Sequence, residues 1–190
     1  MQAADGSRAS RREQILQAAA ELFATHGFHG VGIDDIGAAV GISGPALYRH
    51  FRSKDAMLGE MLVSISEGLY AGARARADAA GPDLLAELIR FQVDFALRHP
   101  ALITVQERNF GNLTDPDRRQ VRARQRSYVE IWVAAIRANT PTVSEPAARA
   151  AAHAVFGLIN STPHSRYLDR EQMTELLIGM ARAGLDAAAG

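Results

Sequence analysis

The stretch that decides the fold runs from residue 33 to residue 54 and reads I-D-D-I-G-A-A-V-G-I-S-G-P-A-L-Y-R-H-F-R-S-K. Apolar residues recur at helical spacing on both sides of Gly41, which predicts two short helices joined by a tight turn. Ser43 can cap the second helix, and Pro45 suits its first turn, where a missing N–H costs nothing. The core between the two helices is predicted to contain Ile36, Ala39, Ile42, Leu47 and Phe51.

The charge of this stretch differs from that of the whole chain. Lys+Arg and Asp+Glu both number 21, so the formal net charge is zero. Between residues 43 and 54, however, there is no acidic residue, whereas Arg49, His50, Arg52 and Lys54 are present. The stretch therefore has the plan of a helix-turn-helix, whose second helix lies in the major groove while basic side chains meet phosphates.

The rest of the sequence predicts an all-α protein. No segment alternates apolar and polar residues in the manner of a strand, and only 6% of residues are aromatic. Start and stop residues predict about nine helices, three small and six larger, at residues 11–26, 33–40, 45–51, 54–77, 83–99, 101–109, 115–138, 144–160 and 169–187. We expect a DNA-binding domain at 1–54, with a flexible arm at 1–10, and a helical body at 55–190.

Several classes of protein are excluded by composition. The chain has no Cys, which excludes a disulfide framework, a thiolate metal site and a Cys nucleophile. The first ten residues contain no apolar run typical of a signal peptide, and no apolar stretch is long enough to span a bilayer. A cytoplasmic protein without a membrane partner is expected.

Two groups of residues resemble the motifs of the TetR family of bacterial transcriptional regulators. The first is A-x-x-L-F-x-x-x-G-F at residues 19–28, and the second comprises D-I at 35–36, A-x-x-G-I-S at 38–43, L-Y-x-H-F at 47–51 and S-K at 53–54. The resemblance is specific over roughly the first third of the chain and rests on helix number and length beyond it. It implies a three-helix DNA-binding head, a ligand-binding body, and a homodimer formed through the last two long helices.

The resemblance also implies which residues contact DNA. The positions that match phosphate contacts are Ser43, Tyr48, His50 and Lys54. The positions that match base contacts are Gly44, Pro45, Ala46 and Arg49. Arg49 is the candidate for a guanine contact, because the small residues before it lack donors and can read only thymine methyls or allow close backbone approach; a phosphate contact by Arg49 is the open alternative. From the arm, Arg8, Arg11 or Arg12 is expected to reach the minor groove or the backbone.

One position departs from the family pattern. The family usually has a Thr at the start of the second helix, where this chain has Gly32. Gly can still cap a helix, but its lost hydroxyl leaves Asp34 or backbone N–H groups to replace that phosphate contact.

The body is expected to hold a mostly apolar pocket with a few polar groups. The candidate ligand-binding residues are Phe91, Phe95, Asn109, Phe110, Tyr128, Trp132 and Phe156; further polar candidates are Arg108, His153 and Asn160. For any one of these aromatic residues, plain core packing is the simpler explanation, although Tyr128 and Trp132 each bring a donor that needs a partner. Arg118, Arg122 and Arg126 share a helix face, which indicates either a solvated surface or a site for an anionic ligand.

The resemblance implies a repressor that binds a palindromic operator as a homodimer. A small, largely apolar effector, such as an acyl-CoA or another lipid-like or aromatic compound, would release it. Two alternatives remain open from the sequence: an enzyme, and a helical small-molecule-binding protein whose head does not bind DNA. His26 and His29 lie beside glycines without an acidic neighbour, and no nucleophile elbow or phosphate-binding loop occurs. We therefore predict no catalytic residue, no metal and no cofactor.

Overall fold

The computed structural model describes residues 10–79, 83–165 and 167–187. Within these ranges there are nine α-helices, two short 3-10 helices and no strand, which confirms the all-α prediction. The α-helices are α1 (Arg11–His26), α2 (Ile33–Ala39), α3 (Gly44–Leu47), α4 (Lys54–Ala79), α5 (Leu84–Arg98), α6 (Pro100–Asn109), α7 (Asp115–Asn139), α8 (Glu145–Ile159) and α9 (Arg170–Ala187); the 3-10 helices are η1 (Phe110–Asn112) and η2 (Thr162–His164). Of the predicted arm, residues 1–9 lie outside the described ranges.

Several of the helices begin where the sequence offers a capping side chain. At α3, Ser43 Oγ accepts a hydrogen bond from the N–H of Ala46 at 3.4 Å, and Ser144 caps α8 in the same way. At α1, Ser10 and Glu13 form a capping box in which each side chain accepts from the other's N–H. These local bonds explain why the predicted helix starts agree with the structure to within a residue or two.

The second helix of the motif is shorter than predicted. α3 ends at Leu47 rather than at residue 51. Beyond it, the N–H groups of Arg49 and His50 bond to carbonyls three residues back, which tightens the chain into a turn. The turn brings Phe51 into the core, where its side chain is 2% exposed.

The core of the helix-turn-helix differs from the prediction at one residue. The structure buries three of the predicted residues, Ile36, Leu47 and Phe51. Ile42 is half-buried, but Ala39 is exposed, so that prediction was wrong. Gly37 faces inward instead, and a Cβ there would lie 2.7 Å from the carbonyl oxygen of Ile42. The two helices therefore meet through backbone at this point.

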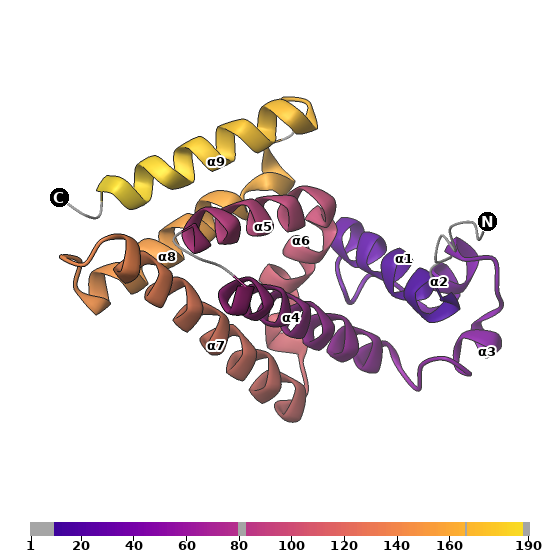
Figure 1. Cartoon of the computed structure of the whole chain (residues 1–190). Helices are drawn as coiled ribbons and strands as arrows, with labels where there is room; N and C mark the ends of the chain where they lie inside the picture. Colours follow the sequence, from indigo (N-terminus) through magenta and orange to yellow (C-terminus); the bar gives the residue numbers. More distant parts are fainter. Residues whose placement is uncertain (1–9, 80–82, 166, 188–190) are drawn as a thin grey trace, which may run out of the picture.

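α4 connects the head, formed by α1, α2 and α3, to the body (Figure 1). Its N-terminal half packs Leu58 and Leu62 into the same hydrophobic cluster as Phe23 of α1. That cluster also contains Val105 of α6 and Val121 of α7. The packed core thus crosses the boundary predicted between residues 54 and 55, and close packing can transmit a shift of α6 or α7 to the head.

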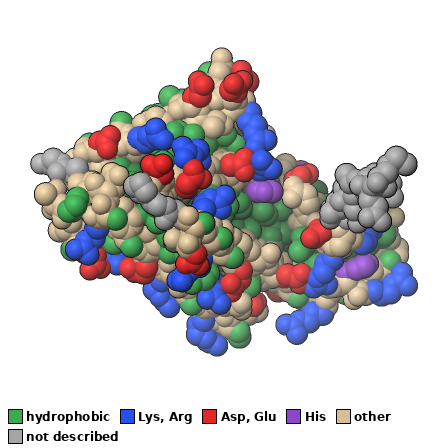
Figure 2. Space-filling model, viewed as in Figure 1, with side chains coloured by type: hydrophobic (Ala, Val, Ile, Leu, Met, Phe, Trp, Pro, Cys, Tyr) green, Lys and Arg blue, Asp and Glu red, His purple; other side chains and the backbone are tan. Residues whose placement is uncertain are grey.

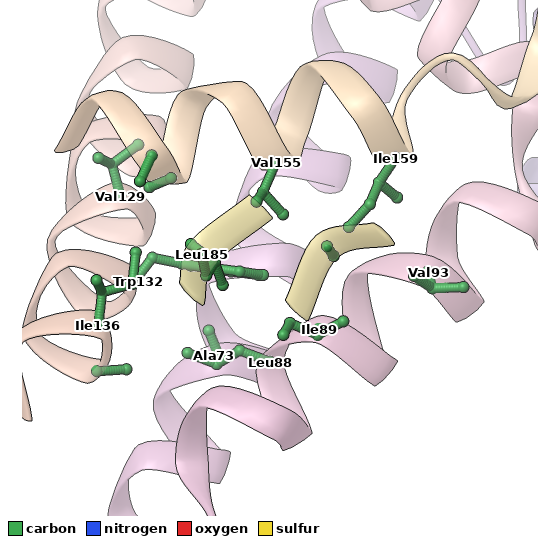
Figure 3. Packing of buried hydrophobic residues seen from close by; sticks show 14 of the residues in the cluster. Ala73, Leu88, Ile89, Val93, Val129, Trp132, Ile136, Val155, Ile159 and Leu185 are labelled. Carbon is green, nitrogen blue, oxygen red and sulfur yellow. The ribbon is translucent and has the colours of Figure 1, made fainter. Parts of the chain in front are cut away.

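The body has a second core, which α4, α5, α7, α8 and α9 enclose. Figure 3 shows Trp132 and Ile136 of α7, Val155 of α8, Leu88 of α5 and Leu185 of α9 directed toward one another. Trp132 is fully buried, and its ring centroid lies 5.0 Å from that of Phe156. α9 lies at the edge of the body against α5 and α8.

A membrane-spanning helix was not found in the part of the chain that the structure describes: none of these helices is both long and apolar enough.

Candidate functional site

The segment after Ser43 presents side chains to solvent. Tyr48 is 55% exposed, and Pro45, Arg49 and Arg52 are also exposed. Figure 2 shows Lys and Arg side chains around the lower right of the molecule, where Figure 1 places α3. This end of the head therefore carries an accessible basic surface.

Gly44 does not share this exposure. It is buried, and a side chain there would collide with the carboxylate of Asp34. Gly44 was predicted to face bases, but the structure places it at the contact between α2 and α3. The absence of a side chain at Gly44 leaves room for Asp34, and the candidates for base contacts that are exposed or half-buried are Pro45, Ala46 and Arg49.

Lys54, the only lysine in the chain, is bound within the head. Its Nζ donates to the carbonyl oxygens of Phe28 at 2.7 Å and Val31 at 2.8 Å, and it lies 4.6 Å from the centre of the Phe28 ring. An ammonium has three donors, so one remains for a phosphate. Lys54 therefore fixes the loop between α1 and α2 to the start of α4, whatever else it contacts.

Replacing Lys54 with Met should destabilise the protein by about 1–3 kcal/mol, because two part-buried carbonyls lose their charged donor. Arg52→Met is the matched control, since Arg52 is exposed two residues away and should change stability by less than about 0.5 kcal/mol. Urea unfolding followed by circular dichroism measures both. Equal stabilities of the two variants would show that the carbonyl contacts contribute nothing.

The arginines at the start of α1 are also engaged inside the head. Arg11 Nη2 donates to the carbonyl oxygen of Val40 at 2.6 Å. Arg12 donates to the carboxylate of Glu60 and to the carbonyl of His50, and its guanidinium stacks on a ring of the core. The Glu60 contact raises the pKa of Arg12 above its usual value. Both side chains thus hold α1 against the turn and α4, while Arg8 lies outside the described residues.

At position 32, where the family usually has a Thr, the start of α2 is capped by a carboxylate, and the replacement of the phosphate contact by Asp34 or backbone N–H groups stays a prediction. Asp35, rather than Asp34, accepts a hydrogen bond from the N–H of Gly32 at 2.7 Å. Asp34 lies instead against Gly44. The start of α2 is therefore held from its own first turn, and no hydroxyl is available there for a phosphate.

A half-open cavity lies in the body between α4, α5, α6, α7 and α8. Its main lobe has a volume of about 560 Å³, and a smaller lobe of about 270 Å³ adjoins it. The residues that line both lobes are Leu69, Gln92, Gln106, Gln125 and Asn160. The combined space falls within the range of small-molecule sites.

The candidate ligand residues separate into two groups. Those that line the cavity are Phe95, Phe110, Tyr128 and Phe156. Those that do not are Phe91, Asn109 and Trp132. Phe91 fills the space above Gly72 and is covered by Arg76, whose guanidinium lies 4.0 Å from its ring centre. Asn109 and Trp132 are buried outside the cavity lining. The structure therefore does not bring these three candidates to the cavity.

The glutamines of the cavity wall were not among the residues predicted from the sequence. Gln92 is 3% exposed; it accepts a hydrogen bond from the Tyr128 hydroxyl at 2.7 Å and donates to Asn160 at 3.1 Å. Burial raises the pKa of Tyr128. A signal was present, because Gln92 interrupts an apolar helix between Phe91 and Val93.

The three arginines on one face of α7 have different surroundings. Arg118 donates to the carbonyls of Gly111 and Leu113 and so closes the corner between η1 and α7. Arg122 lies with its guanidinium 5.4 Å from the ring centre of Phe110, and Arg126 is exposed. None of them lines the cavity, so the structure does not bring them together as an anion site.

The fold and these two sites define a class: a helix-turn-helix head on a helical body that contains a ligand-sized cavity. Two family models match the chain. Residues 15–61 match bacterial regulatory proteins of the tetR family, and residues 78–164 match the tetracyclin repressor-like C-terminal domain. The chain belongs to the TetR family, which consists of transcriptional regulators rather than enzymes.

Curated relatives include the transcriptional repressor KstR2 of Mycolicibacterium smegmatis, 31% identical over 66% of this chain and 62% of that protein. The transcriptional repressor NicS of Pseudomonas putida is 33% identical over 50% of this chain and 45% of its own length. The chain thus spans less than two thirds of the length of these relatives.

Solved structures share the fold over nearly the whole chain. A TetR-family regulator from Bordetella parapertussis has a TM-score of 0.80 at 21% identity, covering 92% of this chain and 95% of that one. KstR2 of Mycobacterium tuberculosis has a TM-score of 0.74 at 23% identity, and the match covers 94% of this chain and 96% of that one. AibR, solved with isovaleryl coenzyme A and operator DNA, has a TM-score of 0.73 at 20% identity, and the match covers 90% of this chain and 97% of that one.

Proposed function

We propose that this protein is a ligand-responsive transcriptional repressor. It binds a palindromic operator as a homodimer and is released by a small, largely apolar effector held in the body cavity. The observation that carries the proposal is that Pro45, Tyr48 and Arg49 are exposed on a segment free of acidic residues, in a head whose core continues into the cavity-bearing body. The match of both parts to one regulator family supports it.

The head would read DNA through few side chains. Arg49 is the candidate for a guanine, while Pro45 and Ala46 offer apolar contacts to thymine methyls. Tyr48 and His50, on the turn that follows α3, would meet phosphates and fix the register. The Lys54 ammonium retains one donor for the same purpose.

The dimer would form through α8 and α9. On α9, Leu176 and Met180 are 45% and 47% exposed, which is unusual for large apolar side chains. On α8, Ala147, Ala154 and Gly157 are exposed small residues that would allow close helix approach. Two heads held this way would place their recognition segments about one DNA turn apart.

The effect of ligand binding would be transmitted to the head through α6 and η2. Leu102 and His164 line the main cavity on one side, and on the other they line a groove of about 540 Å³ between α1 and α6. A ligand that displaces either wall changes the packing of α6 against α1. Because the coupling is reciprocal, a ligand that favours the displaced arrangement must weaken operator binding.

The proposal is tested by selecting genomic fragments that bind the purified protein. We expect the wild type to enrich a palindromic site, and the double variant Tyr48→Ala/Arg49→Ala to lose at least about tenfold in affinity for it, since a base contact is worth about 1–3 kcal/mol. Both residues are exposed, so the fold should survive.

The matched control is Tyr167→Ala/Arg137→Ala, which removes an exposed Tyr and an exposed Arg from the body. It should bind the selected site like the wild type. If no fragment is enriched at any salt concentration, the head does not read DNA and the protein is a small-molecule-binding module. Equal losses in the two double variants would place the DNA contacts outside residues 45–49.

A further inference from the structure

We infer that the body cavity takes an uncharged ligand with an aromatic or other flat apolar body and a carbonyl, amide or hydroxyl group, and that it rejects carboxylates and phosphates. The inference rests on the proposed function only in treating this cavity as the effector site. The chemistry of the walls carries it.

Four amide side chains, Gln92, Gln106, Gln125 and Asn160, form the shared wall of the two lobes. Both polar atoms of the Gln92 amide are hydrogen-bonded within the protein, to Tyr128 and Asn160. Gln106 and Gln125 have no hydrogen-bond partner among the described residues. A free amide both donates and accepts, so these two can satisfy a carbonyl, an amide or a hydroxyl equally well.

No Lys or Arg lines either lobe among the residues that the structure describes. The titratable side chains along the lining are the buried Tyr128, whose raised pKa keeps it uncharged near neutral pH, and Glu107, His153 and His164, which are all exposed. A buried anionic group would therefore have no counter-charge within the cavity, and burying an unpaired charge is far more costly than burying a neutral polar group that is hydrogen-bonded.

The remaining walls are apolar and largely aromatic. Phe95, Phe110 and Ile103 line the main lobe, and Tyr128 and Phe156 line the smaller one. The Tyr128 and Phe156 rings are stacked, with centroids 5.6 Å apart and planes 22° apart. Such walls favour a flat ring that continues the stack.

The test compares two compounds of nearly identical shape, 1-naphthaleneacetamide and 1-naphthaleneacetate, by isothermal titration of the full chain near neutral pH without DNA. The amide should bind at least about tenfold more tightly, because only the acetate carries an uncompensated charge. Gln125→Arg should reverse this order by supplying a cation at the shared wall. Gln125→Leu should weaken the amide without helping the acetate.

Gln120→Arg is the control, since it adds the same charge to an exposed position of α7 outside the cavity and should leave the ratio unchanged. The inference is overturned if the acetate binds as tightly as the amide, if neither binds at millimolar concentration, or if isovaleryl coenzyme A binds more tightly than the amide. It is overturned equally if Gln120→Arg shifts the ratio as Gln125→Arg does. Since no DNA is present, a failure of the fragment selection leaves this result standing.

Discussion

Gly37→Ala should reduce operator affinity by roughly a thousandfold, toward the level of non-specific binding. A Cβ at Gly37 would lie 2.7 Å from the carbonyl oxygen of Ile42, which is backbone and cannot rotate away. The Gly37 carbonyl also accepts hydrogen bonds from the N–H groups of Val40 and Ile42, at 3.2 and 2.9 Å. The added methyl must therefore push α2 and α3 apart, which moves all base-facing residues at once.

The matched control is Gly68→Ala, which adds the same methyl to an exposed position of α4 with nothing within 4 Å. It should leave DNA binding intact and stabilise the helix by about 0.5–1 kcal/mol. Band-shift titrations on the selected operator compare the two variants, and circular dichroism shows that the body stays folded. Unchanged affinity in Gly37→Ala would mean that α3 is not the element that reads DNA.

Gly37 also shows which features of the fold could be predicted from the sequence and which could not. Helix starts are set by side chains close in sequence, such as Ser10, Ser43 and Ser144, so the sequence predicted them well. α2, in contrast, has 7 residues, fewer than are needed to fix its buried face by periodicity. Ala39 was therefore expected in the core that Gly37 occupies.

The walls of the cavity could not be predicted from the sequence, because they depend on contacts between helices that are far apart in the chain. Phe91 and Phe95 lie on the same helix, and both fit an apolar face. Phe91 nevertheless turns away from the cavity because Gly72 of α4 leaves room for its ring. Likewise, Gln106 and Gln125 look like ordinary surface residues until α6 and α7 place them on one wall. Such pairings are not encoded in the spacing of any one segment.

Trp132→Ala should destabilise the protein by about 3–5 kcal/mol, the range for removing a large buried aromatic side chain. Trp132 is fully buried in the body core, against Phe156 at 5.0 Å and Tyr128 at 6.3 Å between ring centroids. Because it is the only Trp in the chain, unfolding in urea must be followed by circular dichroism, at a fixed protein concentration.

Trp132→Phe separates the packing contribution from the polar one. The indole Nε1 is buried without a hydrogen-bond partner among the described residues. Removing it should therefore cost no hydrogen bond, and the loss should be only about 1–2 kcal/mol from the smaller ring. A loss in Trp132→Phe equal to that in Trp132→Ala would contradict this account, because it would mean that the N–H group, and not the volume of the ring, stabilises the core. A loss below about 1 kcal/mol in both variants would mean that the core around α7 is loosely packed.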